Sequence, residues 1–69
     1  MKGDARSAWQ VLNKLIAEDP NGRAYYARAL ANYSLKRKAE ALSDIDNAIR
    51  IGPDNANLRA WRDKILAMP

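Results

Sequence analysis

Residues 23–55, RAYYARALANYSLKRKAEALSDIDNAIRIGPDN, decide the fold of this 69-residue chain. Apolar residues recur every three or four positions on both sides of the block Lys36-Arg37-Lys38, as they do along one face of an amphipathic helix. The recurring residues are Tyr25, Ala29, Leu30 and Tyr33 before the block, and Ala41, Leu42, Ile45, Ala48 and Ile49 after it. The pattern predicts two helices, near residues 23–35 and 38–51.

Helix-breaking residues stand at both ends of this stretch, as Pro20-Asn21-Gly22 and Gly52-Pro53-Asp54-Asn55. The same periodicity continues outside them. It is carried by Ala5, Ala8, Trp9, Leu12, Leu15 and Ile16 on one side, and by Leu58, Trp61, Ile65 and Leu66 on the other. Two further helices are therefore predicted near residues 4–18 and 55–67. The expected fold class is all-α, with four helices in a single domain over residues 1–69.

The composition favours helices and excludes most catalytic chemistry. Thirteen alanines, a single valine and only three glycines suit helices better than strands. The chain has no cysteine and no histidine, so disulfides, Cys/His metal sites and the commonest general base are excluded. The acidic residues are dispersed, and Asp44 and Asp46, two positions apart on a helix, are expected to be solvated. We expect no enzyme activity, no metal and no cofactor.

The charge pattern narrows the class of partner. Twelve basic residues against eight acidic ones give a net charge of +4, and both signs are mixed along the chain. No apolar run approaches the ~18 residues that span a membrane, and no signal-peptide core is present, so we expect a soluble chain in an unknown compartment. Lys36-Arg37-Lys38 beside Tyr33 would suit a nucleic acid, but Glu40 follows closely and repels phosphates. Nucleic-acid binding is therefore the less favoured hypothesis.

The two proline breaks lie 33 residues apart, which suggests an internal repeat. At this offset Ala8 pairs with Ala41 and Leu12 with Ile45. Carried forward, the same offset pairs Tyr25 with Leu58 and Tyr33 with Leu66. A period in this range is typical of stacked helical hairpins.

The repeat resembles the tetratricopeptide repeat (TPR) family. Residues at the family's spacing are Tyr25, Ala29, Ala41, Ile45, Ala48 and Pro53. The resemblance implies an α-solenoid fragment with a partial repeat over 3–20, a full repeat over 22–53 and a C-terminal capping helix over 54–69. Because the helices then follow the order B, A, B, A, we expect a fragment of a longer array or an engineered chain. Arg28 and Asn32 depart from the family pattern, which usually has leucine and tyrosine there.

The resemblance also implies a function, namely binding of a protein or peptide without catalysis. In such arrays the first helix of each pair lines a concave face. By resemblance to the family's groove, the candidate binding residues are Arg23, Tyr26, Leu30, Tyr33, Arg59 and Asp63.

Self-assembly is the alternative function. The helix near residues 4–18 lacks the helix that would normally cover it, which leaves a stripe of apolar residues. This stripe consists of Ala5, Ala8, Leu12 and Leu15. We therefore predict a homodimer or higher oligomer through this face, while Trp9 and Ile16 pack on the next helix near Tyr25 and Ala29.

The block Lys36-Arg37-Lys38 leaves two conformations open. Such a turn usually has glycine, but here good helix formers run on into Ala39-Glu40-Ala41. Residues 23–51 can therefore form one continuous helix, which would require a domain-swapped dimer. They can equally form an ordinary hairpin, held by packing of Ala29 on Ala41.

Overall fold

The computed structural model describes residues 4–52 and 56–69, and these form four α-helices and no strand. The helices are α1 (Ala5–Glu18), α2 (Gly22–Ser34), α3 (Lys38–Ile51) and α4 (Ala56–Leu66). The all-α prediction is confirmed, and each predicted helix end agrees with the structure to within one residue. The sequence predictions that involve Gly3 and Pro53-Asp54-Asn55 fall outside the described residues.

Local signals start the first two helices. The carboxylate of Asp4 accepts a hydrogen bond from the backbone N–H of Arg6 at 3.1 Å and so caps α1. The side-chain oxygen of Asn21 accepts from the N–H of Ala24 at 2.9 Å and caps α2. Each bond satisfies a donor that the first helical turn would leave without a partner. The asparagine after Pro20 therefore starts the next helix.

The turn between α2 and α3 is a hairpin, and it closes without glycine. The N–H of Arg37 donates to the carbonyl of Asn32 at 2.9 Å, and the N–H of Lys36 donates to the carbonyl of Tyr33 at 3.1 Å. This pair of bonds is a Schellman motif, with Lys36 in the left-handed position at φ 63°. No side chain caps the start of α3. The continuous helix is therefore not what the structure has: α2 ends at Ser34, because backbone bonds reverse the chain there.

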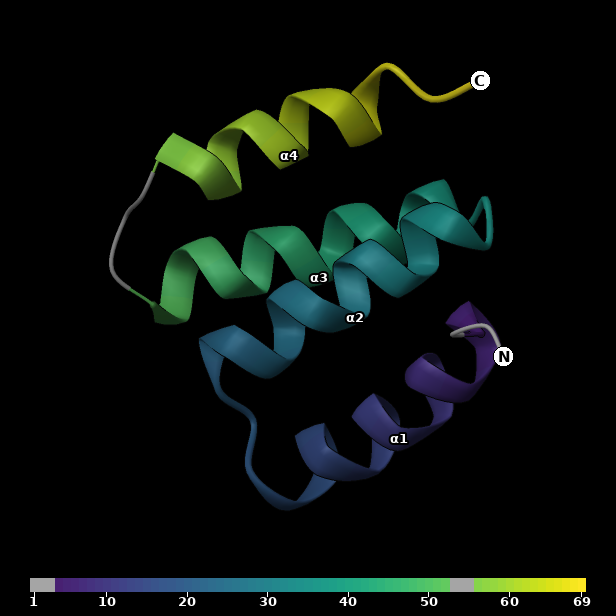
Figure 1. Cartoon of the computed structure of the whole chain (residues 1–69). Coiled ribbons are helices and arrows are strands. Elements are labelled where there is room, and N and C mark those ends of the chain that lie inside the picture. Colours follow the sequence, from purple (N-terminus) through teal and green to yellow (C-terminus); the bar gives the residue numbers. More distant parts are fainter. Residues whose placement is uncertain (1–3, 53–55) are drawn as a thin grey trace.

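The helices stack in chain order (Figure 1): α1 packs on α2, α2 on α3, and α3 on α4. The core lies where α2, α3 and α4 meet, and consists of Ala29, Ala41, Ile45, Ala48, Leu58 and Ile65. Ala29 and Ala41 are both fully buried, which lets α2 and α3 approach closely. By contrast, α1 buries only Ile16 among its described residues. One face of this helix consequently remains open.

The predicted offset of 33 residues separates the starts of α1 and α3, at Ala5 and Lys38. Between α2 and α4 the same offset pairs Tyr25, which packs against the core, with the buried Leu58. The pairing of α2 with α4 stays a prediction.

Candidate functional site

The two candidate tyrosines of α2 lean towards α4. The Tyr33 ring meets the Trp61 ring edge-on, with centroids 5.3 Å apart and an interplanar angle of 81°. The Tyr26 hydroxyl accepts a hydrogen bond from the side-chain amide of Asn57 at 3.2 Å. Both tyrosines are half-buried. Each therefore joins α2 to α4 and still presents part of its surface to solvent.

A pocket of about 520 Å³ opens beside Tyr33, where α2 and α4 end. Its lining residues are Tyr33, Ser34, Lys36, Lys64, Ala67, Met68 and Pro69. Lys36 and Lys64 make this pocket basic, and the Lys64 ammonium lies 4.8 Å from the centre of the Trp61 ring. The pocket thus places positive charge next to aromatic and thioether surface. We call it the lysine pocket.

A second pocket, of about 430 Å³, lies at the opposite end of α2. Its lining residues are Gly22, Arg23, Tyr26, Ala48, Gly52, Asn57 and Leu58. The backbones of the two proline-containing breaks approach each other closely here. A Cβ on Gly22 would lie 3.4 Å from the Cα of Gly52. Arg23 is exposed at the edge of this pocket. We call it the arginine pocket.

The six predicted groove residues do not form one site. Arg23 and Tyr26 share the arginine pocket, and Tyr33 lines the lysine pocket. Leu30, half-buried between them on α2, lines a third hollow against α1. Arg59 and Asp63 lie exposed on α4. Sequence reasoning named Lys36 only as part of the basic block, and it missed Lys64, which directly follows the predicted groove residue Asp63.

The hollow between α1 and α2 has a volume of about 400 Å³ and a mostly apolar lining. Its lining residues are Asp4, Ala5, Ala8, Leu12, Ala27, Leu30, Ala31 and Ser34. Three of the four predicted self-association residues lie in it, and the fourth, Leu15, is 46% exposed. Val11, which sequence reasoning missed, is 60% exposed. Its position four residues before Leu15 would have placed it on the same helix face.

The basic block at the hairpin turn is partly engaged within the chain. The Arg37 guanidinium lies 4.6 Å from the centre of the Trp9 ring on α1. The Lys38 ammonium donates a hydrogen bond to the backbone carbonyl of Met68 at 3.1 Å. The aromatic contact of Trp9 is therefore with Arg37, while the expected burial of Ile16 is confirmed. Two of the three cations of the block already have partners, which weakens the case for phosphate binding.

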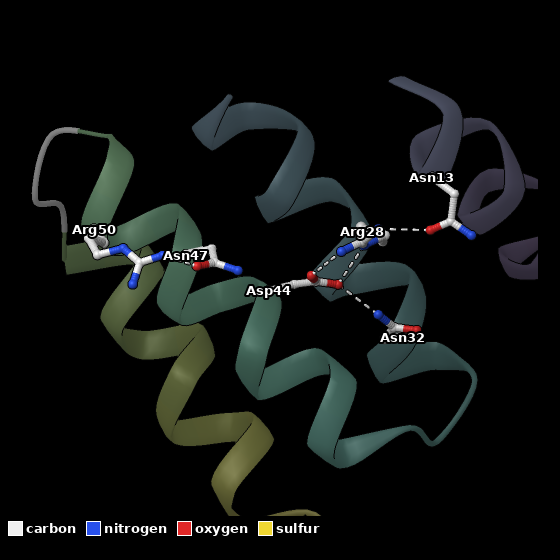
Figure 2. A network of polar contacts seen from close by, with 6 residues as sticks. All are labelled: Asn13, Arg28, Asn32, Asp44, Asn47 and Arg50. Atoms are coloured by element: carbon white, nitrogen blue, oxygen red, sulfur yellow. Dashed lines mark hydrogen bonds and ion pairs between the residues drawn. The ribbon is translucent and has the colours of Figure 1, made fainter. Parts of the chain in front are cut away.

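A buried polar network joins α2 and α3 (Figure 2). Asp44 accepts two hydrogen bonds from the Arg28 guanidinium, at 2.7 and 2.9 Å, and one from the Asn32 side-chain amide at 2.8 Å. Arg28 also donates to the side-chain oxygen of Asn13 on α1 at 2.8 Å. Through Arg28, this network therefore links three helices.

The network corrects the prediction that Asp44 is solvated, since this residue is only 2% exposed. Asp44 lies three residues after Ala41 and four before Ala48, on the face that α3 turns towards the core. Its carboxylate raises the pKa of the Arg28 guanidinium above the usual value, because the hydrogen bonds to Asp44 outweigh the partial desolvation. Asp46 is exposed as predicted and bonds to Arg62 of α4 at 2.7 Å.

The described residues contain no group of three or more acidic, histidine or cysteine side chains placed to hold a metal ion. Across residues 4–52 and 56–69, every helix is too short or too polar to cross a membrane.

Comparison with protein-family models, with curated proteins and with solved structures finds no match to this chain. The described residues of the chain form two basic pockets along α2 and α4, and one apolar hollow between α1 and α2.

Proposed function

We propose that this chain is a TPR-like helical-repeat module that binds an acidic peptide along α2 and α4. The stacking of consecutive helices supports the repeat interpretation. So does the burial of Ala29, Ala41, Ile45 and Ala48, the residues that carry the resemblance. In a stack of this kind α2 and α4 are the equivalent first helices of two successive pairs.

The observation that carries the proposal is the pair of pockets, each of which combines a tyrosine with a cation. Arg23 lies in the first turn of α2 and Lys36 lies two residues past its end, so the two cations flank a helix of 13 residues, about 20 Å long. An extended peptide covers this distance in about six residues. The ligand is therefore a short extended peptide with acidic side chains at both ends and apolar ones between them.

The affinity is modest. A surface of two helices buries little of a peptide, and partly exposed ion pairs contribute only about 0–1 kcal/mol each. We expect a dissociation constant no better than micromolar, or about −8 kcal/mol.

Fluorescence polarisation with two labelled hexapeptides tests the proposal. One has two acidic residues at each end and two leucines in the centre, and the other has lysines in place of the acidic residues. We expect the acidic peptide to bind and the basic one not to bind. Arg23→Glu and Lys64→Glu should each weaken binding about tenfold, because each replaces an attraction with a repulsion.

Lys14→Glu is the matched control. It makes the same charge change on an exposed residue of α1, outside both pockets, and should leave peptide binding unchanged. Equal weakening by all three variants would show a response to net charge alone and would remove the pockets from consideration. Preference for random RNA over the peptide, retained at physiological salt, would favour nucleic-acid binding instead.

A further inference from the structure

The side-chain oxygen of Asn32 is a buried acceptor without a donor. Asn32 is 1% exposed, and the described residues place no hydrogen-bond donor on its Oδ1 atom. Its amide nitrogen donates to Asp44 at 2.8 Å, and Figure 2 shows the oxygen turned away from that carboxylate. Rotating the amide would set two acceptors against each other, so the orientation is fixed. A polar atom this deeply buried normally has a partner, so we expect a donor from outside the chain here.

Asn32 lies at the floor of a pocket of about 240 Å³ between α1, α2 and α3. We call it the Asn32 pocket. Its lining includes Trp9, Arg28, Asn32, Glu40, Ser43 and Asp44. Asn32 and Asp44 are buried and form the floor, whereas Glu40 and Ser43 are exposed and form the rim. The Asn32 pocket shares no lining residue with the lysine pocket or the arginine pocket.

The ion pair at the floor of the Asn32 pocket is already satisfied. Arg28 donates through three nitrogens, twice to Asp44 and once to Asn13. The two charges of the pair therefore cancel, and their hydrogen bonds are used within the network. Glu40 differs, because among the described residues it forms no ion pair. The groups that remain for a ligand are a buried acceptor at the floor and a negative charge at the rim.

From these observations we propose that the Asn32 pocket binds the guanidinium group of a ligand. A guanidinium is planar and carries five N–H donors around one positive charge. One edge of it donates to the Asn32 oxygen, while another edge faces the Glu40 carboxylate. The site is separate from the surface along α2 and α4, so the proposal does not depend on peptide binding.

The indole of Trp9 favours the same ligand. An aromatic ring attracts a cation placed over its face, and a guanidinium also stacks on it. The chain already shows this preference, since the Arg37 guanidinium lies 4.6 Å from the centre of the Trp9 ring. Glu40 is part of the pocket lining and Arg37 is not. A cation that enters the pocket therefore contacts the carboxylate directly.

Other ligand chemistries fit the Asn32 pocket less well. A carboxylate or phosphate ligand offers no proton to the Asn32 oxygen and is repelled by Glu40. An alkylammonium carries donors, but it is strongly hydrated and lacks a plane that stacks on the indole. A metal ion is disfavoured, because no three acidic side chains gather to hold one in the described part of the chain.

An NMR titration with butylguanidinium, butylammonium and the uncharged butylurea tests the proposal. We expect butylguanidinium to bind in the millimolar range, because it has few atoms, and to shift the signals of the Asn32 side-chain amide and the Trp9 indole N–H together. The other two probes should bind about fivefold more weakly, since butylurea lacks the charge and butylammonium lacks the planar fork. Equal binding of either would overturn the proposal. So would the absence of any shift, which would mean that water alone fills the pocket.

A glycine–arginine–glycine peptide blocked at both ends is the fourth probe, and it identifies the source of the guanidinium. If the peptide binds more tightly than butylguanidinium, the group belongs to an arginine side chain of a partner protein. If it binds more weakly, the group belongs to a small molecule. Both results support the site itself.

Glu40→Gln should weaken the binding of butylguanidinium about fivefold and leave that of butylurea unchanged. Glu18→Gln is the matched control, because it removes the same charge from an exposed residue of α1 outside the pocket lining. Asn32→Leu removes the buried acceptor and should weaken binding at least about tenfold, with circular dichroism as the check on its fold. Because Glu40 is exposed, Glu40→Gln decides the matter even where Asn32→Leu unfolds the chain. Unchanged binding in Glu40→Gln, or equal weakening by Glu18→Gln, would overturn the proposal.

Discussion

At the scale of single residues, the buried ion pair Arg28–Asp44 joins α2 to α3 at the centre of the molecule. The carboxylate is 3% exposed as a side chain and the guanidinium 23% exposed, so solvent screens the pair only weakly. The amide oxygen of Asn32 is also buried, with no hydrogen-bond partner among the described residues. A network that leaves one acceptor unsatisfied is expected to specify how α2 packs on α3 more than to stabilise the fold.

Removing one member of this pair should be costly. Asp44→Ala leaves the Arg28 guanidinium without its counter-charge, and we expect the free energy of unfolding in urea to fall by about 3 kcal/mol. The double variant Arg28→Met/Asp44→Leu removes both charges and should restore most of that loss. If the double variant is as unstable as the single one, the pair contributes through shape and not through charge.

The charge of Arg28 should leave the free energy of unfolding independent of pH over the acidic and neutral range. Its pKa is raised above the usual value, so the folded state gains from the charged form at every pH below the pKa of the unfolded chain. That contribution is lost only as the pH rises through the folded pKa, which lies above the usual arginine value.

At the scale of elements, the hairpin turn stores a small strain. Lys36 has a positive φ, which costs a non-glycine residue about 1–2 kcal/mol. The strain is accepted because the turn lets Ala29 and Ala41 meet in the core. Both alanines are fully buried in this close helix contact, and neither has a side chain that can adjust.

Lys36→Gly should therefore stabilise the fold by about 1 kcal/mol in urea unfolding. Helical content and molecular mass should stay unchanged, because the hairpin is already present. Lys14→Gly, in the middle of α1, is the opposite control and should destabilise by about 1 kcal/mol. A loss of helix or of mass on Lys36→Gly would instead point to the continuous helix in solution.

The element boundaries could be predicted because their signals are local. Asn21 after Pro20 starts a helix through its own side chain, whatever the rest of the chain does. The hairpin was one of two conformations that the sequence left open, because residues 35–39 favour helix and the packing of Ala29 on Ala41 is not a local signal. Asp44 was misassigned because its carboxylate was judged without Arg28, sixteen residues earlier. Four of the six predicted groove residues are divided among three pockets, and Arg59 and Asp63 line none of these three. Spacing along one helix does not encode how α4 packs relative to α2.

At the scale of the whole molecule, stability should be uneven along the stack. The helices contact their neighbours in the chain, and α3 lies between α2 and α4 with four buried residues. By comparison, α1 has one buried residue and packs on α2 alone among the main helix contacts. Local opening is easiest where few buried contacts have to break.

Hydrogen exchange should show this order. We expect the slowest amides in α3, around Ile45 and Ala48, and faster exchange along α1. If the chain self-associates through α1, as its sequence predicts, the protection of α1 should rise with protein concentration while that of α3 changes little. Protection in α1 that equals α3 at high dilution would contradict the uneven stack.

The hairpin turn also connects regions that the helix stack keeps apart. Two adjacent residues of the turn contact the two outer helices of the stack or their ends. The Arg37 guanidinium lies over the Trp9 ring of α1, and the Lys38 ammonium donates a hydrogen bond to the carbonyl of Met68, beyond the end of α4. Met68 also lines the lysine pocket. A ligand in that pocket that displaces Lys38 from Met68 would therefore disturb the neighbouring residue Arg37, which contacts Trp9. With Trp61 replaced by phenylalanine, the indole of Trp9 would be a built-in optical reporter, whose emission would register occupancy of the lysine pocket through the hairpin turn.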